Sequence, residues 1–289
     1  MTTSPLNALA ARLESVEALD GPARAAGRTV RGLIPDGAAK DALSGAWLGH
    51  AVHPMLTDIP IGTWTSSVLL DWMGGKDSRS ASDRLILTGV LAAGATVATG
   101  WSDWADAEQR DPAVRRSGLV HAAANATATA LMIGSYLARN RGARGRGKLL
   151  SLAGISLLGA GGWLGGHLSY AQGVGVDNTV FEPESTDWTP TIPEADLAEG
   201  APRCVKAGDV PVLLVRQDGR VHALANRCTH RGGPLHEGEL GHGTITCPWH
   251  GSTFSLEDGS IERGPAAYPQ PTYDVRVTAG TVEVRRVAR

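Results

Sequence analysis

Apolar residues gather in four long stretches between residues 55 and 170, separated by three short charged breaks. The stretches cover about residues 55–73, 85–104, 118–138 and 149–170. Each is close to the ~20 residues that an α-helix needs to cross a bilayer. Because the helices of soluble proteins usually show a polar stripe, we predict an all-α four-helix transmembrane bundle over residues 50–176. A soluble helical bundle with an Ala/Gly-rich core is the alternative.

The segments on either side of this bundle have different patterns. Residues 6–19 place leucines at near-helical spacing, which predicts a short amphipathic helix. Residues 21–45 mix Gly, Pro and charge without a period, which predicts a connector, so residues 1–49 form an N-terminal amphipathic and connector segment. Residues 177–200 are acidic, contain several prolines and lack Lys and Arg, which predicts an extended linker.

The C-terminal part of the chain alternates apolar and polar residues with a period of two. Short apolar runs at residues 210–215 and 221–225 flank the turn pair Asp218-Gly219, which favours a β-hairpin. The alternation continues through residues 273–284. We therefore predict a small all-β antiparallel domain over residues 201–289, which makes the chain multi-domain.

Composition and charge narrow the classes of function. The formal net charge is −2 and the arginines are scattered rather than striped, which excludes nucleic acid as a partner. We recognise no export signal in the first 30 residues and expect the N-terminus to be retained. Three cysteines cannot form a disulfide framework, and we expect Cys204 to be a buried apolar residue.

The other two cysteines each stand beside a histidine. The motifs Cys228-Thr-His230 and Cys247-Pro-Trp-His250 are separated by 16 residues and offer two thiolates and two imidazoles. This donor set suits a [2Fe-2S] cluster in which histidine replaces cysteine on one iron. Glycines beside the ligands permit the tight turns that bring two loops together. A structural zinc site is the alternative, although zinc sites usually space paired ligands by two to four residues.

These motifs closely resemble those of the Rieske family, over about residues 201–289. The resemblance implies an antiparallel β-sandwich with cluster-binding loops and a function in one-electron transfer. It implies that Cys228, His230, Cys247 and His250 bind the iron. It also implies that a third loop, Gly264-Pro265-Ala266, covers the cluster.

Departures from the respiratory Rieske pattern are informative. Those members carry a disulfide between the cluster loops, whereas this chain has Gly233 and Trp249 at the two places, so the domain looks more like the Rieske ferredoxins. Ser252 matches a serine that bonds a bridging sulfide in the high-potential members, but Phe254 replaces a tyrosine that bonds a ligand cysteine. Because hydrogen bonds to sulfur raise the potential, we expect a value within the Rieske range of about −150 to +300 mV, below its top.

Three histidines are predicted at one edge of the helical bundle. If helix one begins on one side of the membrane, His53, His121 and His167 all lie on that side. Ionisable residues inside a membrane bundle are candidates for function. We predict a b-type haem with His121 and His167 as the axial pair and His53 as the substitute. The alternatives are another metal, a quinone site, or histidines that only cap helix ends.

The same region resembles an uncharacterised family of bacterial four-helix membrane domains, over about residues 50–176. The residues that carry this resemblance are His53-Pro54-Met55-Leu56, Gly100, Asp103, His121, Gly165-Gly166 and Gly173-Val174-Gly175-Val176. The resemblance implies no settled activity.

These features predict a membrane-anchored Rieske ferredoxin-like protein of oxidoreductase type. It would pass single electrons between a soluble redox partner and an acceptor in the lipid bilayer, a haem or a quinone. We identify no substrate site, and a Rieske oxygenase would need a 2-His-1-carboxylate iron site that we do not find after His250. A redox-sensing membrane protein and an electron-transfer component of an oxygenase system are the alternatives.

Two arguments about membrane orientation oppose each other. Arg139, Arg141, Arg144, Arg146 and Lys148 crowd one loop, and the positive-inside rule would then put the cluster outside the cell. The absence of a recognisable export signal and of the disulfide suits a reducing compartment instead. We expect a multi-pass protein of the cell membrane with its Rieske domain on the cytoplasmic face.

Overall fold

The chain folds into two compact units in the computed structural model, which describes residues 4–183 and 186–287. One unit consists of Met1–Pro35 and Val52–Val174 and is helical. The other consists of Asp36–Ala51 and Gly175–Arg289 and is rich in β-strands. The predicted order, a helical region followed by a β-rich domain, is confirmed.

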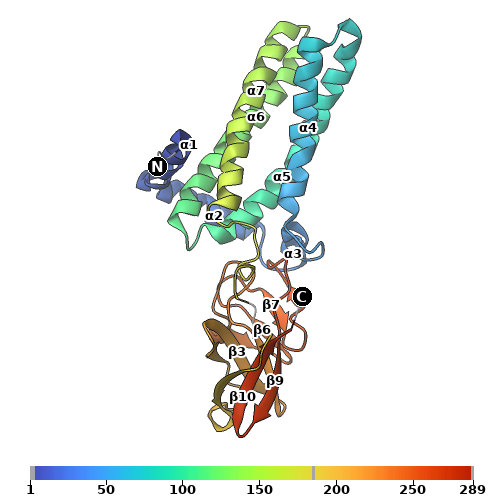
Figure 1. Ribbon diagram of the computed structural model, residues 1–289. Coiled ribbons are helices and arrows are strands. Elements are labelled where there is room, and N and C mark those ends of the chain that lie inside the picture. The colour runs from blue at the N-terminus through green and yellow to red at the C-terminus, as the bar shows by residue number, and fades with distance from the viewer. Residues whose placement is uncertain (1–3, 184–185, 288–289) are drawn as a thin grey trace. The chain divides into compact units, whose positions relative to one another are not determined.

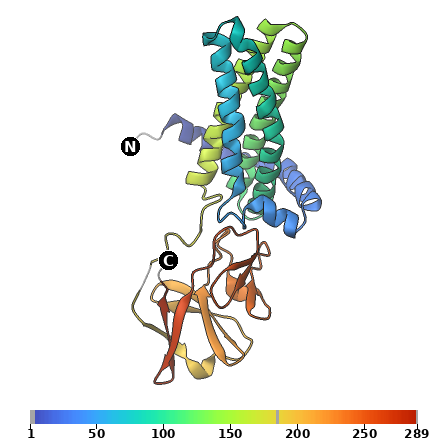
Figure 2. The ribbon, with the colours of Figure 1, turned by 90° about the vertical axis from the view of Figure 1, so that its right-hand side faces the viewer.

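Four long helices make up most of the helical unit (Figures 1 and 2). They are α4 (Val52–Met73), α5 (Arg79–Ala107), α6 (Pro112–Asn140) and α7 (Arg144–Tyr170). The predicted count of four is not matched, because the described residues form seven α-helices. The others are α1 (Pro5–Glu14), α2 (Asp20–Leu33) and α3 (Ala38–Ser44), the last in the β-rich unit.

Most of helix α2 lies within the segment predicted as a connector, and small residues make its buried contacts. Ala23 is fully buried, and a β-carbon at Gly27 would collide with the carboxylate of Glu108, the residue that follows α5. Small residues on its buried side let α2 pack closely on the long helices.

The long helices follow from clear local signals. Asp111 caps α6, since its carboxylate accepts hydrogen bonds from the backbone N–H groups of Ala113 and Val114, and Pro112 occupies the first turn. The segments Lys76–Ala107 and Arg144–Tyr170 are long and apolar enough to cross a membrane. They contain the second and the fourth of the four apolar stretches, residues 85–104 and 149–170.

The described residues of the β-rich unit form three antiparallel sheets. One contains β1 (Thr189–Pro193), β10 (Thr281–Arg286) and β9 (Tyr273–Thr278), and the second contains β2 (Arg203–Ala207), β3 (Val210–Gln217) and β4 (Arg220–Ala225). The third contains β5 (Glu239–Leu240), β6 (Thr244–Thr246), β7 (Thr253–Ser255) and β8 (Ile261–Arg263). Strand β1 lies inside the predicted linker, where Thr189 pairs with Val284 of β10.

Strand β3 is buried on both faces, which explains its uninterrupted apolar run. Val212 and Leu214 belong to one hydrophobic core, and Leu213 and Val215 belong to another. The second core also holds Cys228 and Cys247. The cluster motifs therefore start from the packed interior of the unit.

The hairpin of β3 and β4 turns at the predicted pair. Asp218 and Gly219 have φ of 54° and 73°, the left-handed conformations that a type I′ turn requires.

Candidate metal centre

The two cysteine motifs lie on loops of the same backbone geometry. The N–H of Gly232 donates to the carbonyl of Cys228 at 2.8 Å, and the N–H of Gly251 donates to the carbonyl of Cys247 at 3.2 Å. Both glycines have φ of +74°, which a side chain would strain. In each loop a glycine four residues after the cysteine therefore turns the chain back over the thiol.

The four predicted ligand side chains meet at the end of these loops. Cys228 and Cys247 are buried, with 1% and 3% of their surfaces exposed. The ring centroids of His230 and His250 lie 5.0 Å apart, with planes at 89°. The structure thus brings together two thiols and two imidazoles from distant parts of the sequence.

The electrostatics of these side chains follow from their crowding and burial. The pKa of the Cys228 thiol is well above its usual range because the Cys247 thiol lies beside it and both are buried. Burial lowers the pKa of His230, and the charges of His250, Arg231 and Lys40 lower it further. His230 is thus held neutral, the form that binds a metal.

The donor set fits a [2Fe-2S] cluster. Within the described part of the chain, Nδ1 of His230 is buried and has no hydrogen-bond partner. A buried polar nitrogen without a partner is costly, and metal coordination is one way to satisfy it. Two cysteines and two histidines are the ligands that a Rieske-type centre uses.

The surroundings of the thiols leave little room. A β-carbon at Gly233 would lie 2.7 Å from Sγ of Cys247 and 3.1 Å from the ring of Trp249. Ser252 is fully buried, and its hydroxyl oxygen accepts the N–H of Ala266 in the third loop at 2.9 Å. Phe254 is fully buried in the core beneath.

Gln270 supports the first loop, a role that the sequence does not reveal. Its amide donates to the carbonyls of Ala225 and Arg227, both at 2.7 Å, and its oxygen accepts the N–H of Thr229 at 3.2 Å. A single glutamine among prolines carries no signal of this role, because its partners are backbone groups some 40 residues away in sequence.

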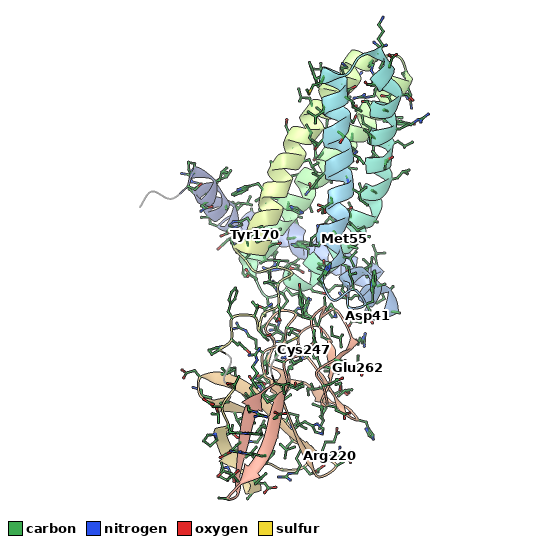
Figure 3. The ribbon with its side chains drawn as sticks, turned by 45° about the vertical axis from the view of Figure 1, so that its right-hand side comes forward. Asp41, Met55, Tyr170, Arg220, Cys247 and Glu262 are labelled. Carbon is green, nitrogen blue, oxygen red and sulfur yellow. The ribbon has the colours of Figure 1, made fainter. Side chains whose placement is uncertain are left out.

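Helix α3 packs against the third loop and was also missed. A β-carbon at Gly264 would lie 2.9 Å from Oδ1 of Asp41 and 3.0 Å from Oγ of Ser44. Figure 3 shows Asp41, Cys247 and Glu262 at one end of the β-rich unit and Arg220 toward the other. Helix α3, within the N-terminal segment predicted as a connector, therefore lies beside the metal centre. The periodic signal of a seven-residue helix is too short to reveal this.

The third cysteine plays no part in this arrangement. Cys204 is exposed on β2, which corrects the expectation that it is buried. Within its sheet, this strand pairs with β3 alone.

The histidines of the helical unit lie at the end where α4 and α6 begin and where α5 and α7 finish. Met55 and Tyr170 mark this end in Figure 3. Nδ1 of His53 bonds the carbonyl oxygen of Thr96 at 2.9 Å, and Nδ1 of His121 bonds that of Gly161 at 2.8 Å. The ring centroids of His53 and His121 are 6.5 Å apart.

His167 points elsewhere. Its Nε2 lies 2.6 Å from Oε1 of Glu14 on α1, and its ring stacks on Trp163 with centroids 5.7 Å apart. A β-carbon at Gly165 would lie 3.1 Å from the His121 ring, and His167 is two residues, or about 200°, further round α7. The structure therefore brings His121 to His53 rather than to His167. The prediction of His121 and His167 as the axial pair rested on their equal depth along the helices. It did not use the direction in which each side chain points around its helix.

Two family models match the chain. The model of the Rieske [2Fe-2S] domain matches residues 187–274, and a model described as a predicted membrane protein (DUF2231) matches residues 49–178. Both resemblances inferred from the sequence are confirmed. The first match also confirms the predicted [2Fe-2S] cluster.

The curated relatives match the β-rich part of the chain. Apoptosis-inducing factor 3 of Homo sapiens is 39% identical over 90 residues, which are 31% of this chain and only 15% of that protein. The 3-phenylpropionate/cinnamic acid dioxygenase ferredoxin subunit of Escherichia coli is 33% identical over 91 residues, 31% of this chain and 85% of that protein. Ferredoxin CarAc of Metapseudomonas resinovorans is 31% identical over 98 residues, 34% of this chain and 92% of that protein.

Proposed function

Because this chain belongs to the Rieske [2Fe-2S] family through its C-terminal domain, we propose that it is a one-electron carrier whose cluster is held by Cys228, His230, Cys247 and His250. The observation that carries the proposal is the meeting of two buried thiols and two imidazoles on loops of matching geometry. The cluster supplies the redox chemistry when bound, and the protein positions and tunes it.

Residues around the ligands set the reduction potential of the centre. The hydroxyl oxygen of Ser252 accepts the Ala266 N–H, so its own hydrogen is available to a bridging sulfide. Such a bond stabilises the more negative reduced centre and raises the potential. Phe254 offers no hydroxyl where the high-potential members have tyrosine. We therefore place the potential inside the Rieske range and below its top.

The helical unit serves as the membrane anchor in this proposal, with α4–α7 as a four-helix transmembrane bundle. Support comes from the match to a predicted membrane protein family over residues 49–178 and from two helices apolar enough to span. Large apolar side chains on these helices face outward, with Leu91 71% and Leu149 63% exposed. A lipid surface would cover them.

We assign the Rieske domain to the cytoplasmic face of the cell membrane. The domain lacks the inter-loop disulfide, since Gly233 and Trp249 stand at those places, and this suits a reducing compartment. Arg139 and Arg144, two of the basic residues that favour the opposite orientation, are engaged in ion pairs with Asp71 and Asp83. A cysteine introduced at Thr186 should resist an impermeant maleimide in whole cells, and labelling there would reverse the assignment.

Electrons would pass between a soluble redox partner and an acceptor in the membrane, a haem or a quinone. A second candidate is the electron-transfer component of an oxygenase system, which is favoured by relatives that are named as ferredoxin subunits of dioxygenases. Reduction of an added quinone by the reduced protein in nanodiscs, without any oxygenase, distinguishes the first role from the second.

The chain provides a matched test of the cluster itself. Cys228→Ser and Cys247→Ser should abolish iron and acid-labile sulfide in the full-length protein, whereas Cys204→Ser should leave both unchanged because Cys204 is exposed on β2. A reversible one-electron titration should accompany the cluster in the parent and in Cys204→Ser. Equal cluster content in all four proteins would refute the assignment.

A further inference from the structure

His53 and His121 come from different helices and are held in one defined tautomer. Each uses Nδ1 against a backbone carbonyl, that of Thr96 at 2.9 Å and that of Gly161 at 2.8 Å. A carbonyl oxygen can only accept, so Nδ1 carries the hydrogen in both rings. The lone pair of each neutral imidazole is therefore on Nε2. A hydrogen bond from the other ring nitrogen to a backbone carbonyl is the arrangement that orients histidines for metal ligation.

We propose that His53 and His121 are the two axial ligands of a b-type haem bound in the helical unit. Two imidazoles on opposite sides of one metal, each at a metal–nitrogen distance of about 2.0 Å, have ring centroids roughly 6 Å apart. The observed separation is 6.5 Å. The ring planes stand at 81°, which two axial ligands can adopt because each turns about its own metal–nitrogen bond.

A porphyrin explains why two protein ligands suffice. Outside the metal centre of the β-rich unit, the described residues contain no group of three or more His, Cys, Asp or Glu side chains placed to hold a metal ion. A bare ion at this pair would lack the further protein ligands that such sites use. Haem iron brings four nitrogens of its own and needs only axial ligands from the protein.

Two glycines let the imidazoles approach the facing helices. A β-carbon at Gly100 of α5 would lie 2.5 Å from the His53 ring, and one at Gly165 of α7 would lie 3.1 Å from the His121 ring. A side chain at position 100 would force His53 out of its place. By contrast, a β-carbon at Gly94, on the same helix, would meet nothing within 4 Å.

Asn125 reinforces His121 without competing for its coordinating electrons. Its amide nitrogen donates to the His121 carbonyl at 2.9 Å and lies 3.3 and 3.2 Å from the two ring nitrogens. Nearly equal distances place the amide over the face of the ring rather than in its plane. Since the Nε2 lone pair lies in the ring plane, it stays available to iron.

Haem binding by this pair is independent of the cluster, while its role as an electron acceptor rests on the proposed function. The experiment uses the full-length protein purified from haem-sufficient membranes, with the reduced-minus-oxidised optical spectrum and the haem content as readouts. The cluster is followed in the same samples by its iron–sulfur signal. Failure of the haem proposal is thereby distinguished from failure of the electron-carrier assignment.

Haem should be present in the parent and lost in His53→Ala and in His121→Ala. It should persist in His167→Ala, because that ring is turned toward Glu14. Gly100→Ala should lower haem occupancy by about tenfold or more, the usual effect of disturbing a supporting residue, while Gly94→Ala leaves it unchanged. Cluster content should stay constant throughout.

The proposal is overturned if the parent contains the cluster but no haem. It is also overturned if haem is lost in His167→Ala and kept in His53→Ala. A non-haem metal that disappears with His53 would overturn it as well, because the pair would then bind an ion directly.

Discussion

Gly233 faces the thiol of Cys247 so closely that a β-carbon at position 233 would lie 2.7 Å from Sγ. The same atom would lie 3.1 Å from the ring of Trp249, so a side chain at position 233 would crowd two neighbours. The absence of a side chain at this position is therefore a requirement of the metal centre. We predict that Gly233→Ala displaces Cys247 and lowers iron and sulfide content severalfold in the purified protein.

A control separates this effect from general loss of stability. Gly208→Ala also strains the backbone, since Gly208 has φ of +61°, but a β-carbon there meets nothing within 4 Å. It should cost about 1 kcal/mol of stability and leave the cluster intact. If Gly233→Ala retains full iron and sulfide, the close packing around Cys247 is not needed for cluster binding.

Ser252 should tune the centre through its hydroxyl. Ser252→Ala removes both the acceptor of the Ala266 N–H and the donor proposed for a sulfide. Such a hydrogen bond stabilises the reduced cluster more than the oxidised cluster. Its loss should therefore lower the midpoint potential while cluster content persists. Redox titration of the full-length protein measures the shift, and an unchanged or raised potential would exclude the sulfide bond.

Lys40 should also raise the potential, although it lies far from the cluster motifs in sequence. It is 3% exposed on α3, and its charge contributes to lowering the pKa of His230. A positive charge near the centre favours the added electron, so Lys40→Met should lower the midpoint potential. A tenfold change in relative stability of the two redox states is about 59 mV, and we expect a shift of that size or less.

The exposed Lys206 of β2 provides the matched control for this prediction. Lys206→Met removes the same charge from the same unit and should leave the potential unchanged. Equal shifts in the two variants would mean that the potential depends on net charge alone. The position of Lys40 on α3 would then have no effect of its own.

The sequence anticipated those features that depend on local periodicity or on rigid spacing. The four long helices follow from apolar stretches, the β3–β4 hairpin follows from Asp218-Gly219, and the metal centre follows from two short motifs. In each case the signal lies within a few residues, so no knowledge of distant contacts is needed.

The features it missed depend on contacts between distant residues. Helix α3 is too short for a periodic signal, and its partner Gly264 lies more than 200 residues away. Gln270 holds the first loop through backbone groups. His167 is turned away from His121 by the rotation of α7 about its axis, which spacing along the chain does not determine.

A buried ion pair should stabilise the helical unit. The side chains of Arg139 on α6 and Asp71 on α4 are fully buried and joined by hydrogen bonds. Asp71→Ala leaves the buried guanidinium of Arg139 with Asp83, which is partly exposed, as its remaining carboxylate partner, so the variant should cost up to about 3–5 kcal/mol of stability. Replacing both, as in Asp71→Leu with Arg139→Met, should recover much of the loss.

Thermal unfolding in detergent or nanodiscs checks this prediction. Asp77→Ala, which removes an exposed carboxylate from the turn that follows α4, is the control and should change little. A double variant as unstable as Asp71→Ala would show that the two side chains contribute separately.

The most direct test of the account is pulsed electron paramagnetic resonance of the dithionite-reduced full-length protein. The account predicts a paramagnetic [2Fe-2S] centre coupled to the ligating nitrogens of two histidines, His230 and His250, with one coupling lost in any cluster that survives His230→Cys. A reduced centre without strong nitrogen coupling, or a protein with full zinc occupancy and no such signal, would contradict it.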